Sequence, residues 1–276
     1  MKEKNKDVHK RVKTPPLGDG GINIVKIGGN VIENEDELDA FLGIFAELPE
    51  PKILVHGGGK LASEMARNLN IPVKMTQGRR ITDAETLDVI TMVYGGKVNK
   101  NMVAQLQAKG CNAIGLSGAD GNTILSIKRP VKEVDFGFVG DVISVNSAVI
   151  TSLLSGGLTP VFCAITHDKN GQLLNTNADT IACELARALT QTYEVTLNYC
   201  FEKAGVLRDV SDEQSVIKQI NTKKYTELVE NGTVSEGMLP KLHNCFYALE
   251  GGVECVKLGK PSMLNPQETE FTTLTL

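Results

Sequence analysis

Two apolar segments of the sequence each end in a run of glycines, and the first of them carries a lysine. Residues 22–27 lead into glycines 28–29, and residues 53–56 lead into glycines 57–59. Glycine lets the backbone approach a ligand because it has no Cβ, and a helix that begins there offers unpaired N–H groups to an anion. A plain tight turn needs glycines too, but Lys26 inside an otherwise apolar strand favours an anion-binding site.

The other polar candidates suit phosphoryl transfer better than nucleophilic or metal chemistry. His56 fits a hydrogen-bonded residue at a strand end better than a base, and no cysteine or histidine has zinc-site spacing. The GxxxxGK[ST] motif and the protein-kinase signatures are missing from the sequence. Phosphoryl transfer to a carboxylate needs no base, only positive charge, N–H donors and a metal ion that arrives with ATP. Lys26 and Lys241 can supply the charge, although solvation at the surface is the ordinary alternative for either lysine.

Length and composition indicate a globular protein of one large or two small domains. The chain has 276 residues, of which 41% are hydrophobic and 22% charged. A formal net charge of −4 gives no reason to expect nucleic acid or a membrane as partner. The six cysteines are scattered, which predicts free thiols in a reducing cytoplasm. Residues 1–21 are basic and poor in apolar residues, so we expect a flexible arm or leader there.

Segments with helical and with strand periodicity alternate along the rest of the chain. We expect helices over 35–48, 61–67, 84–109, 147–155, 180–189, 222–230 and from 237 onward, and strands over 22–27, 53–56, 113–117, 159–165, 193–199 and 253–258. Thr82 or Asp83 is expected to cap helix 84–109, whose glycine pair 95–96 indicates close packing against a partner. Short hairpins are expected over 123–144, with turns at Gly137 and Gly140. The alternation predicts an α/β fold with a largely parallel sheet, in which ligands bind at the carboxyl ends of strands.

Five motifs occur in the order found in N-acetylglutamate kinases, and residues 22–258 resemble that family. The motifs are Val25-Lys26-Ile27-Gly28-Gly29, His56-Gly57-Gly58-Gly59, Gly78-Arg79-Arg80-Ile81-Thr82-Asp83, Asn175-Thr176-Asn177-Ala178-Asp179 and Gly237-Met238-Leu239-Pro240-Lys241. The first is shared across the wider amino-acid kinase fold, whereas the other four together are much more specific. The resemblance implies an open αβα sandwich around a largely parallel sheet. Residues 22–276 would form the kinase domain, with acceptor bound by 22–175 and ATP by 176–276.

The resemblance also implies a role for each motif residue. Lys26 and Lys241 resemble the two lysines that stabilise the transition state, and Asp179 resembles the carboxylate that orients both. Acceptor binding would fall to Gly58, Gly59, Arg80 and Asn175. Phosphate and nucleotide binding would fall to Gly28, Gly29, Glu202, Lys203, Gly205, Gly237 and Met238. Independently, a guanidinium such as that of Arg80 suits a carboxylate because it pairs with two oxygens at once. We expect no metal ligand from the chain, since Mg²⁺ enters with ATP.

Two departures from the family pattern stand out. The nucleotide loop of the family carries Ser-Asp where this sequence has Phe201-Glu202, and the preceding Asn198-Tyr199-Cys200 is also unusual. The family's adenine and ribose contacts are therefore not carried over. The polar, proline-broken arm does not resemble the amphipathic helix of arginine-inhibited hexameric members. We therefore expect a homodimer without arginine feedback, built on the helix that begins at Ala84.

The sequence thus predicts a cytoplasmic, ATP-dependent enzyme of arginine biosynthesis that phosphorylates the side-chain carboxylate of N-acetyl-L-glutamate. N-succinylglutamate and N-acetyl-aminoadipate remain as alternative acceptors, because one methylene discriminates by only about 1–3 kcal/mol. A kinase-like module that binds an amino acid and regulates a partner is the alternative from another class. Intact Lys26, Asp179 and Lys241 argue against such a module. For Asp179 alone, the ordinary alternative is an N-terminal helix cap.

Overall fold

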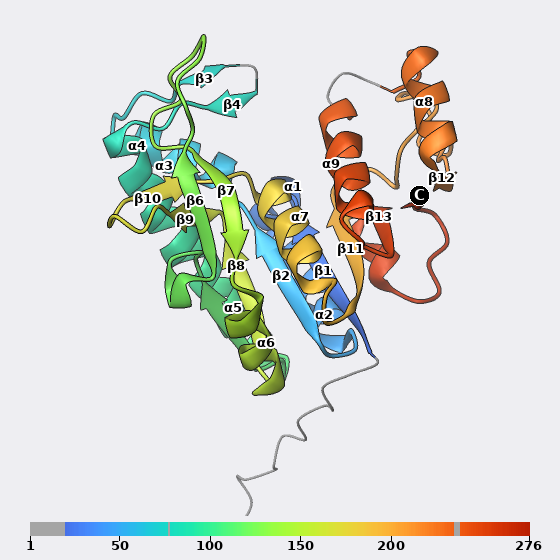
Figure 1. Ribbon diagram of the computed structural model, residues 1–276, viewed down its shortest axis with the longest axis horizontal. Helices are drawn as coiled ribbons and strands as arrows, with labels where there is room; N and C mark the ends of the chain where they lie inside the picture. The colour runs from blue at the N-terminus through green and yellow to red at the C-terminus, as the bar shows by residue number, and fades with distance from the viewer. Residues whose placement is uncertain (1–19, 77, 235–237) are drawn as a thin grey trace, which may run out of the picture.

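An eight-stranded sheet forms the centre of the molecule (Figure 1). The computed structural model describes residues 20–76, 78–234 and 238–276, so most of the predicted arm and Gly237 lie outside the described residues. The strand order is β12-β14-β13-β11-β1-β2-β8-β5. The strands are β1 (Gly21–Ile27), β2 (Lys52–His56), β5 (Ala113–Leu116), β8 (Thr159–Cys163), β11 (Glu194–Cys200), β12 (Gln219–Ile220), β13 (Cys255–Gly259) and β14 (Thr272–Leu274). Only the pair β13–β14 is antiparallel among these neighbours, which confirms the predicted largely parallel sheet.

The central strands are rich in valine, isoleucine and leucine, and their side chains are buried on both faces of the sheet. Near-continuous apolar runs of this kind are typical of parallel strands that helices cover on both sides. The register of β1 and β2 places Ile27 opposite His56. Because both strands run in the same direction, glycines 28–29 and glycines 57–59 follow side by side at one edge. This confirms the predicted pairing of the two glycine-ended strands.

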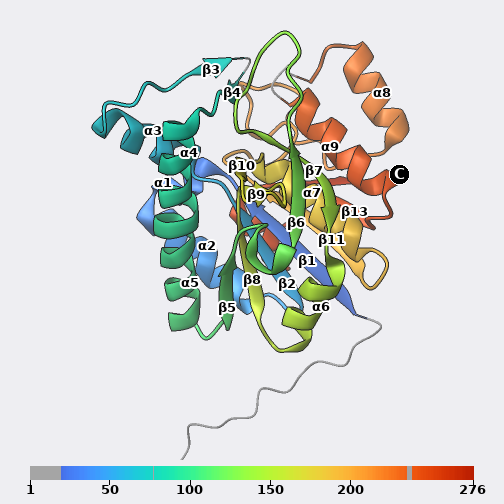
Figure 2. The same ribbon diagram turned by 60° about the vertical axis from the view of Figure 1, so that its left-hand side comes forward.

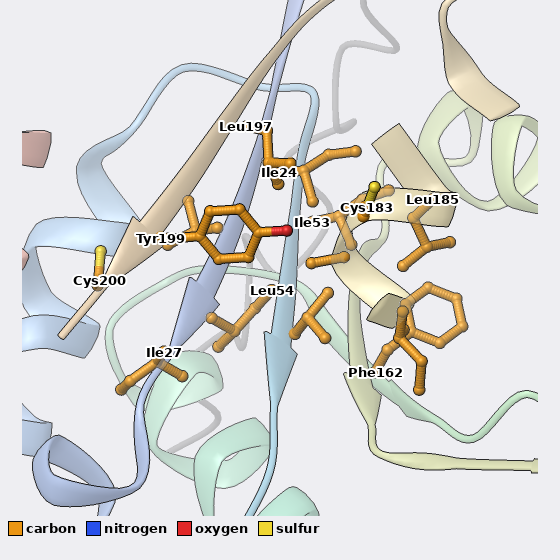
Figure 3. Packing of buried hydrophobic residues seen from close by; sticks show 14 of the residues in the cluster. Ile24, Ile27, Ile53, Leu54, Phe162, Cys183, Leu185, Leu197, Tyr199 and Cys200 are labelled. Carbon is orange, nitrogen blue, oxygen red and sulfur yellow. The ribbon is translucent and has the colours of Figure 1, made fainter. Parts of the chain in front are cut away.

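Helices cover both faces of the sheet, as Figure 2 shows. One face carries α1 (Gly29–Glu33), α2 (Glu35–Glu47), α3 (Gly59–Asn68), α4 (Ala84–Ile90) and α5 (Asn99–Ala108). The other carries α6 (Ser147–Ser155), α7 (Ala178–Leu189) and α9 (Leu239–Glu250), while α8 (Thr222–Glu230) lies beside β12. Figure 3 shows side chains of β1, β2 and β11 gathered with Cys183 and Leu185 of α7 in one apolar core. The layers form the αβα sandwich that the resemblance implies.

A second sheet of four strands lies beside the central one, in the order β10-β9-β6-β7. It comprises β6 (Ile124–Lys128), β7 (Gly140–Val145), β9 (Ile165–His167) and β10 (Leu173–Asn175), and a small hairpin joins β3 (Met75–Thr76) to β4 (Arg79–Arg80). The antiparallel pair β6–β7 confirms a hairpin in this region. Gly137 has a φ of 71° in its loop, but Gly140 is not the predicted turn. It begins β7, where a Cβ would lie 2.7 Å from Thr176 Oγ1, so close packing requires glycine there.

The predicted long helix is a continuous helical segment with a π-helical centre, η1 (Thr91–Val98), between α4 and α5. Asp83 caps it by accepting the N–H of Thr86, as predicted. Gly95 and Gly96 lie inside η1, where a Cβ would make only an ordinary contact or none within 4 Å. Packing within this chain therefore does not explain the glycine pair.

Two short 3-10 helices, η2 (Asp120–Asn122) and η3 (Pro261–Leu264), also belong to the fold. Within the described ranges, no helix has both the length and the apolar character to cross a membrane.

Candidate functional site

The glycine turns after β1 and β2 start helices α1 and α3 at the same edge of the sheet. Gly28 precedes α1, and its N–H donates to the carbonyl of Cys200 at 2.9 Å. Gly58 precedes α3 with a φ of 147°, a conformation that side chains disfavour. A Cβ at Gly58 would lie 3.0 Å from the Tyr94 ring. Both the backbone conformation and the limited space therefore favour glycine at this position. Because glycine has no side chain, an anion could approach the N–H groups at the amino end of α3.

Lys26, Asp179 and Lys241 meet in one charged cluster, although they come from β1, α7 and α9. Lys26 Nζ lies 2.7 Å from Asp179 Oδ1, and Lys241 Nζ lies 3.3 Å from Asp179 Oδ2. The side chains are 14%, 20% and 19% exposed, respectively, so the cluster is largely shielded but reachable from solvent. One carboxylate thus holds two ammonium groups, each on its own oxygen. We call these three residues the lysine–aspartate cluster.

The charge state of Asp179 follows from its neighbours. Burial alone would raise the pKa of its carboxyl, but the ammonium groups of Lys26 and Lys241 outweigh burial and lower the pKa from 3.8 to about 2. The group is therefore an anion at neutral pH. The alternative role as a helix cap is wrong, because Asn177 caps α7 by accepting the N–H groups of Asp179 and Thr180. Asp179 is the second residue of the helix, and its side chain is available to the lysines.

Aromatic side chains from β11 and the residue after it hold Lys241 from another side. Its Nζ lies 5.5 Å from the ring centroid of Tyr199 and 5.4 Å from that of Phe201. The hydroxyl of Tyr199 also donates to the backbone carbonyl of Asp179 at 3.0 Å. Sequence reasoning missed Tyr199 as a site residue. Its only signal was the unusual Asn198-Tyr199-Cys200 run at the end of a strand.

Arg80 reaches the turn that starts α3. Its Nη2 donates to the carbonyl of Gly59 at 2.8 Å and to Ser63 Oγ at 2.6 Å, so the guanidinium lies against the first turn of that helix. Sequence reasoning missed Ser63, which is an ordinary polar residue on the helix. The structure thus brings together three of the predicted acceptor residues, Gly58, Gly59 and Arg80.

Asn175 stands at the end of β10, next to the loop that follows Arg80. Its Nδ2 donates to Thr82 Oγ1 at 3.0 Å, which ties the asparagine–aspartate motif to the Arg80 loop. A Cβ at Gly57 would lie 3.9 Å from the Cβ of Ala178, the residue before Asp179. The amino ends of α3 and α7 are therefore in contact. The glycine turn before α3 thus lies next to the residue that precedes Asp179.

His56 is buried at the end of β2 and hydrogen-bonded at both ring nitrogens. Nδ1 lies 2.8 Å from the carbonyl of Gly57, and Nε2 lies 3.0 Å from Asn99 Nδ2. Burial lowers the pKa of the imidazole to about 4. The ring is therefore neutral at pH 7, with Nδ1 as the donor to the carbonyl and Nε2 as the acceptor from the amide. This arrangement fits the expected structural role and leaves no nitrogen for a substrate.

The predicted nucleotide residues are less closely grouped. Lys203 pairs with Glu213 at 3.1 Å, and Glu202 is exposed in the same loop. Gly205 packs tightly, because a Cβ there would lie 2.5 Å from Thr272 Oγ1. Met238 precedes α9 and accepts its first helical hydrogen bond from Leu242. Nucleotide roles for these residues stay predictions.

A cavity of about 650 Å³ lies between Arg79 of the β3–β4 hairpin and residues of β6, β7 and the loop that joins them. Its lining combines cations, acids and apolar groups: Arg79, Ile127, Arg129, Pro130, Lys132, Glu133, Val134, Phe136 and Asp141.

Across the described residues, no three histidine, cysteine, aspartate or glutamate side chains are grouped as metal ligands would be.

Comparison with known proteins agrees with this geometry. The family model described as the amino acid kinase family matches residues 21–257. The chain is 56% identical over 234 residues to an acetylglutamate kinase of Cytophaga hutchinsonii, covering 84% of this chain and 89% of that protein. It is 54% identical over 244 residues to an acetylglutamate kinase of Phocaeicola vulgatus, covering 88% and 95%.

Among solved structures, carbamate kinase from Giardia lamblia bound to AMP-PNP has the same fold. The TM-score is 0.70 at 11% identity, over 93% of this chain and 98% of that chain. The sequence identities to the two kinases extend over most of both chains. The chain therefore belongs to the amino acid kinase family and, within it, to the acetylglutamate kinases.

Proposed function

We propose that the protein transfers the γ-phosphoryl group of ATP to the side-chain carboxylate of N-acetyl-L-glutamate, as the first two relatives' names indicate. The observation that carries the proposal is the lysine–aspartate cluster, in which two ammonium groups share one carboxylate at 2.7 and 3.3 Å. Positive charge held in a shielded site stabilises a transferring phosphoryl group without having to reorganise during the reaction. The product would be an acyl phosphate in arginine biosynthesis.

The reaction needs no general base. The acceptor carboxylate is already an anion at neutral pH, so its oxygen attacks the γ-phosphorus while the bond from phosphorus to the β-bridging oxygen breaks, and ADP leaves. Lys26 and Lys241 would lie against the oxygens on which negative charge develops. Asp179 would keep both ammonium groups charged and in place. N–H groups at Gly29, Gly58 and Gly59 would supply further donors, in the way that helix amino ends bind phosphates.

The acceptor would be held by its other carboxylate. Arg80 lies against the first turn of α3 and has N–H groups beyond those given to Gly59 and Ser63. A guanidinium fits a carboxylate through paired hydrogen bonds. Asn175 would reach the acyl amide from β10. Together they support binding of the acceptor in the half of the chain before residue 176, with ATP in the half that follows.

Mg²⁺ would enter as part of the MgATP substrate and neutralise charge on the β- and γ-phosphates. The contacts of the Asp179 carboxylate support entry of Mg²⁺ together with ATP. The Asp179 carboxylate is already paired with two lysines, and a cation there would have to displace one of them. We infer action in the cytoplasm, which the cysteines support, since all six are free thiols and five of them are buried.

A coupled assay of ADP release tests the function. The purified protein is given MgATP with N-acetylglutamate, N-succinylglutamate or N-acetyl-aminoadipate, and kcat/KM is compared among them. We expect the highest value with N-acetylglutamate. No turnover with any of the three would favour the non-catalytic regulatory module instead.

N-succinylglutamate is the second candidate acceptor, and the cavity beside the Arg80 loop favours it. That cavity contains Arg79, Arg129 and Lys132, of which Arg129 is paired with Asp141 at 2.6 Å. A succinyl group ends in a carboxylate, which cations attract, whereas an acetyl group ends in a methyl. If the succinyl compound gives the higher kcat/KM, and Arg79→Ala removes that preference, the second candidate replaces the first.

Replacing Arg80 with alanine should weaken acceptor binding selectively. KM for the acylated amino acid should rise by about tenfold or more, because a charge-assisted bidentate contact is lost. KM for ATP should stay within about twofold, since only the acceptor offers an α-carboxylate to this loop. Steady-state kinetics with each substrate varied in turn measure both constants. A rise confined to KM for ATP would move Arg80 to the other half of the site.

The protein should be insensitive to arginine and should be a homodimer. Arginine-inhibited members use an amphipathic amino-terminal helix, and the sequence of residues 1–21 has no apolar helical face. Gly95 and Gly96 in η1, which packing within the chain does not explain, support a close contact between two copies of the helical segment 84–108. ADP release measured over a range of arginine concentrations should give a flat line. Sigmoidal inhibition together with a hexamer in size-exclusion chromatography would contradict both expectations.

A further inference from the structure

Tyr199 lies beside Lys26 in the sheet and contacts both Lys241 and Asp179, although nothing in the motifs assigns it a role. It is a residue of β11, which pairs with β1, and the register places Tyr199 directly beside Lys26. Its ring lies under the ammonium group of Lys241, at 5.5 Å from centroid to Nζ. Its hydroxyl donates to the backbone carbonyl of Asp179 at 3.0 Å. One side chain therefore connects the three elements that carry the cluster.

The surroundings of Tyr199 make these contacts rigid. The residue is 1% exposed, and Figure 3 shows its ring within the apolar core, with the hydroxyl directed toward the helix that carries Cys183 and Leu185. Burial raises the pKa of the phenol well above its usual range, so the hydroxyl remains a donor at every pH of interest. A carbonyl oxygen has two lone pairs, and Asp179 can accept this bond beside the one within its helix. The bond fixes the first turn of α7 over β11.

Phe201 completes the seat for Lys241. It follows β11, is 8% exposed and lies 5.4 Å from the same ammonium nitrogen. Two aromatic faces and one carboxylate oxygen at 3.3 Å thus confine a side chain that has four rotatable bonds. A flexible lysine held in this way needs less ordering when the phosphoryl group arrives, which is how preorganised charge lowers a barrier.

We propose that Tyr199 is a positioning residue for phosphoryl transfer, which holds Asp179 through its hydroxyl and Lys241 through its ring, with Phe201 as the second wall. The proposal rests on the proposed function, because it concerns the geometry of the same cluster. On this proposal, Tyr199 and Phe201 at the end of β11 act on the reaction by positioning Asp179 and Lys241. They need not contact adenine or ribose to have this role.

Removing the hydroxyl alone gives the sharpest test. Tyr199→Phe should lower kcat by about fivefold, the value of one hydrogen bond, while KM for ATP and for the acceptor stay within about twofold. Tyr199→Leu should lower kcat further because the ring contact with Lys241 is also lost, and Phe201→Leu should fall between the two. Tyr193→Phe is the matched control, since Tyr193 precedes the other end of the same strand, and it should leave kcat unchanged.

A double-mutant cycle separates positioning from general packing. In an Asp179→Asn background the cluster is already broken, so adding Tyr199→Phe should reduce kcat no further. An equal loss in both backgrounds, or an unchanged kcat in Tyr199→Phe alone, would overturn the inference while the proposed function stands. No turnover by the unmutated protein with any acceptor would overturn the proposed function and this inference with it.

Discussion

Replacing Lys26 with alanine should abolish most turnover and leave the protein folded. The ammonium group lies 2.7 Å from Asp179 and beside the glycine turn that follows β1, where the transferring phosphoryl group would lie. Removal of one preorganised charge in the transition state should lower kcat by about 10²–10³ or more. The fold should persist, because Asp179 keeps Lys241 as its partner at 3.3 Å. A steady-state assay of ADP release measures kcat, and a thermal melt shows whether the variant is folded.

The chain offers a matched control for Lys26. Lys109 forms an ion pair of similar length with Asp39, at 2.6 Å, and its side chain is 25% exposed. This pair joins the end of α5 to α2 and includes no residue of the glycine turns. Lys109→Ala should therefore lose a comparable ion pair without losing turnover. A folded Lys26→Ala variant whose kcat equals that of the unmutated protein would remove Lys26 from the catalytic set.

Much of the fold was predictable because local periodicity and burial agree. Helices α6 and α8 begin and end at the predicted residues, and the strands β1 and β2 were recognisable from apolar runs that stop at glycine. Two contributions escaped prediction. Strand β14 is three residues long and antiparallel to β13, so its existence depends on a neighbour far away in the chain. The π-helical turn of η1 has the same apolar spacing as an ordinary helix.

Motif positions could propose the members of the lysine–aspartate cluster, whereas their contacts needed the structure. Motif positions pointed to Lys26, Asp179 and Lys241, and the structure places both lysines within ion-pair distance of Asp179. The capping role considered for Asp179 was wrong, because Asn177 two residues earlier has the better geometry for a cap. Tyr199 was not identifiable, since a tyrosine in a strand is ordinarily a core residue. Its role became visible only when strand register and helix position were known.

Asp179→Asn separates an enzyme from a binding module. Asparagine has the same shape as aspartate but no charge, so the two ammonium groups would face each other without the anion that holds them. We expect kcat to fall by at least about tenfold, which is about 1.4 kcal/mol of barrier. KM for the acceptor should stay within about twofold, because Arg80, Gly58 and Gly59 are untouched. Asp39→Asn, which loses the partner of Lys109, should keep full turnover and serves as the control.

The difference in stability between the Asp179→Asn variant and the unmutated protein should depend on pH because of the same ion pairs. The lysines depress the pKa of the folded-state carboxyl to about 2, below the value of about 3.9 in an unfolded chain. A depressed pKa contributes stability above pH ~4 that is lost as the pH falls through about 2, and here it amounts to about 2–3 kcal/mol. Thermal melts should therefore show the variant below the unmutated protein at pH 7, with the difference shrinking toward pH 2. Full turnover with no pH-dependent difference would reduce Asp179 to an ordinary residue of the first turn of α7, whereas lost turnover with intact acceptor binding would identify it as the carboxylate that holds both lysines for phosphoryl transfer.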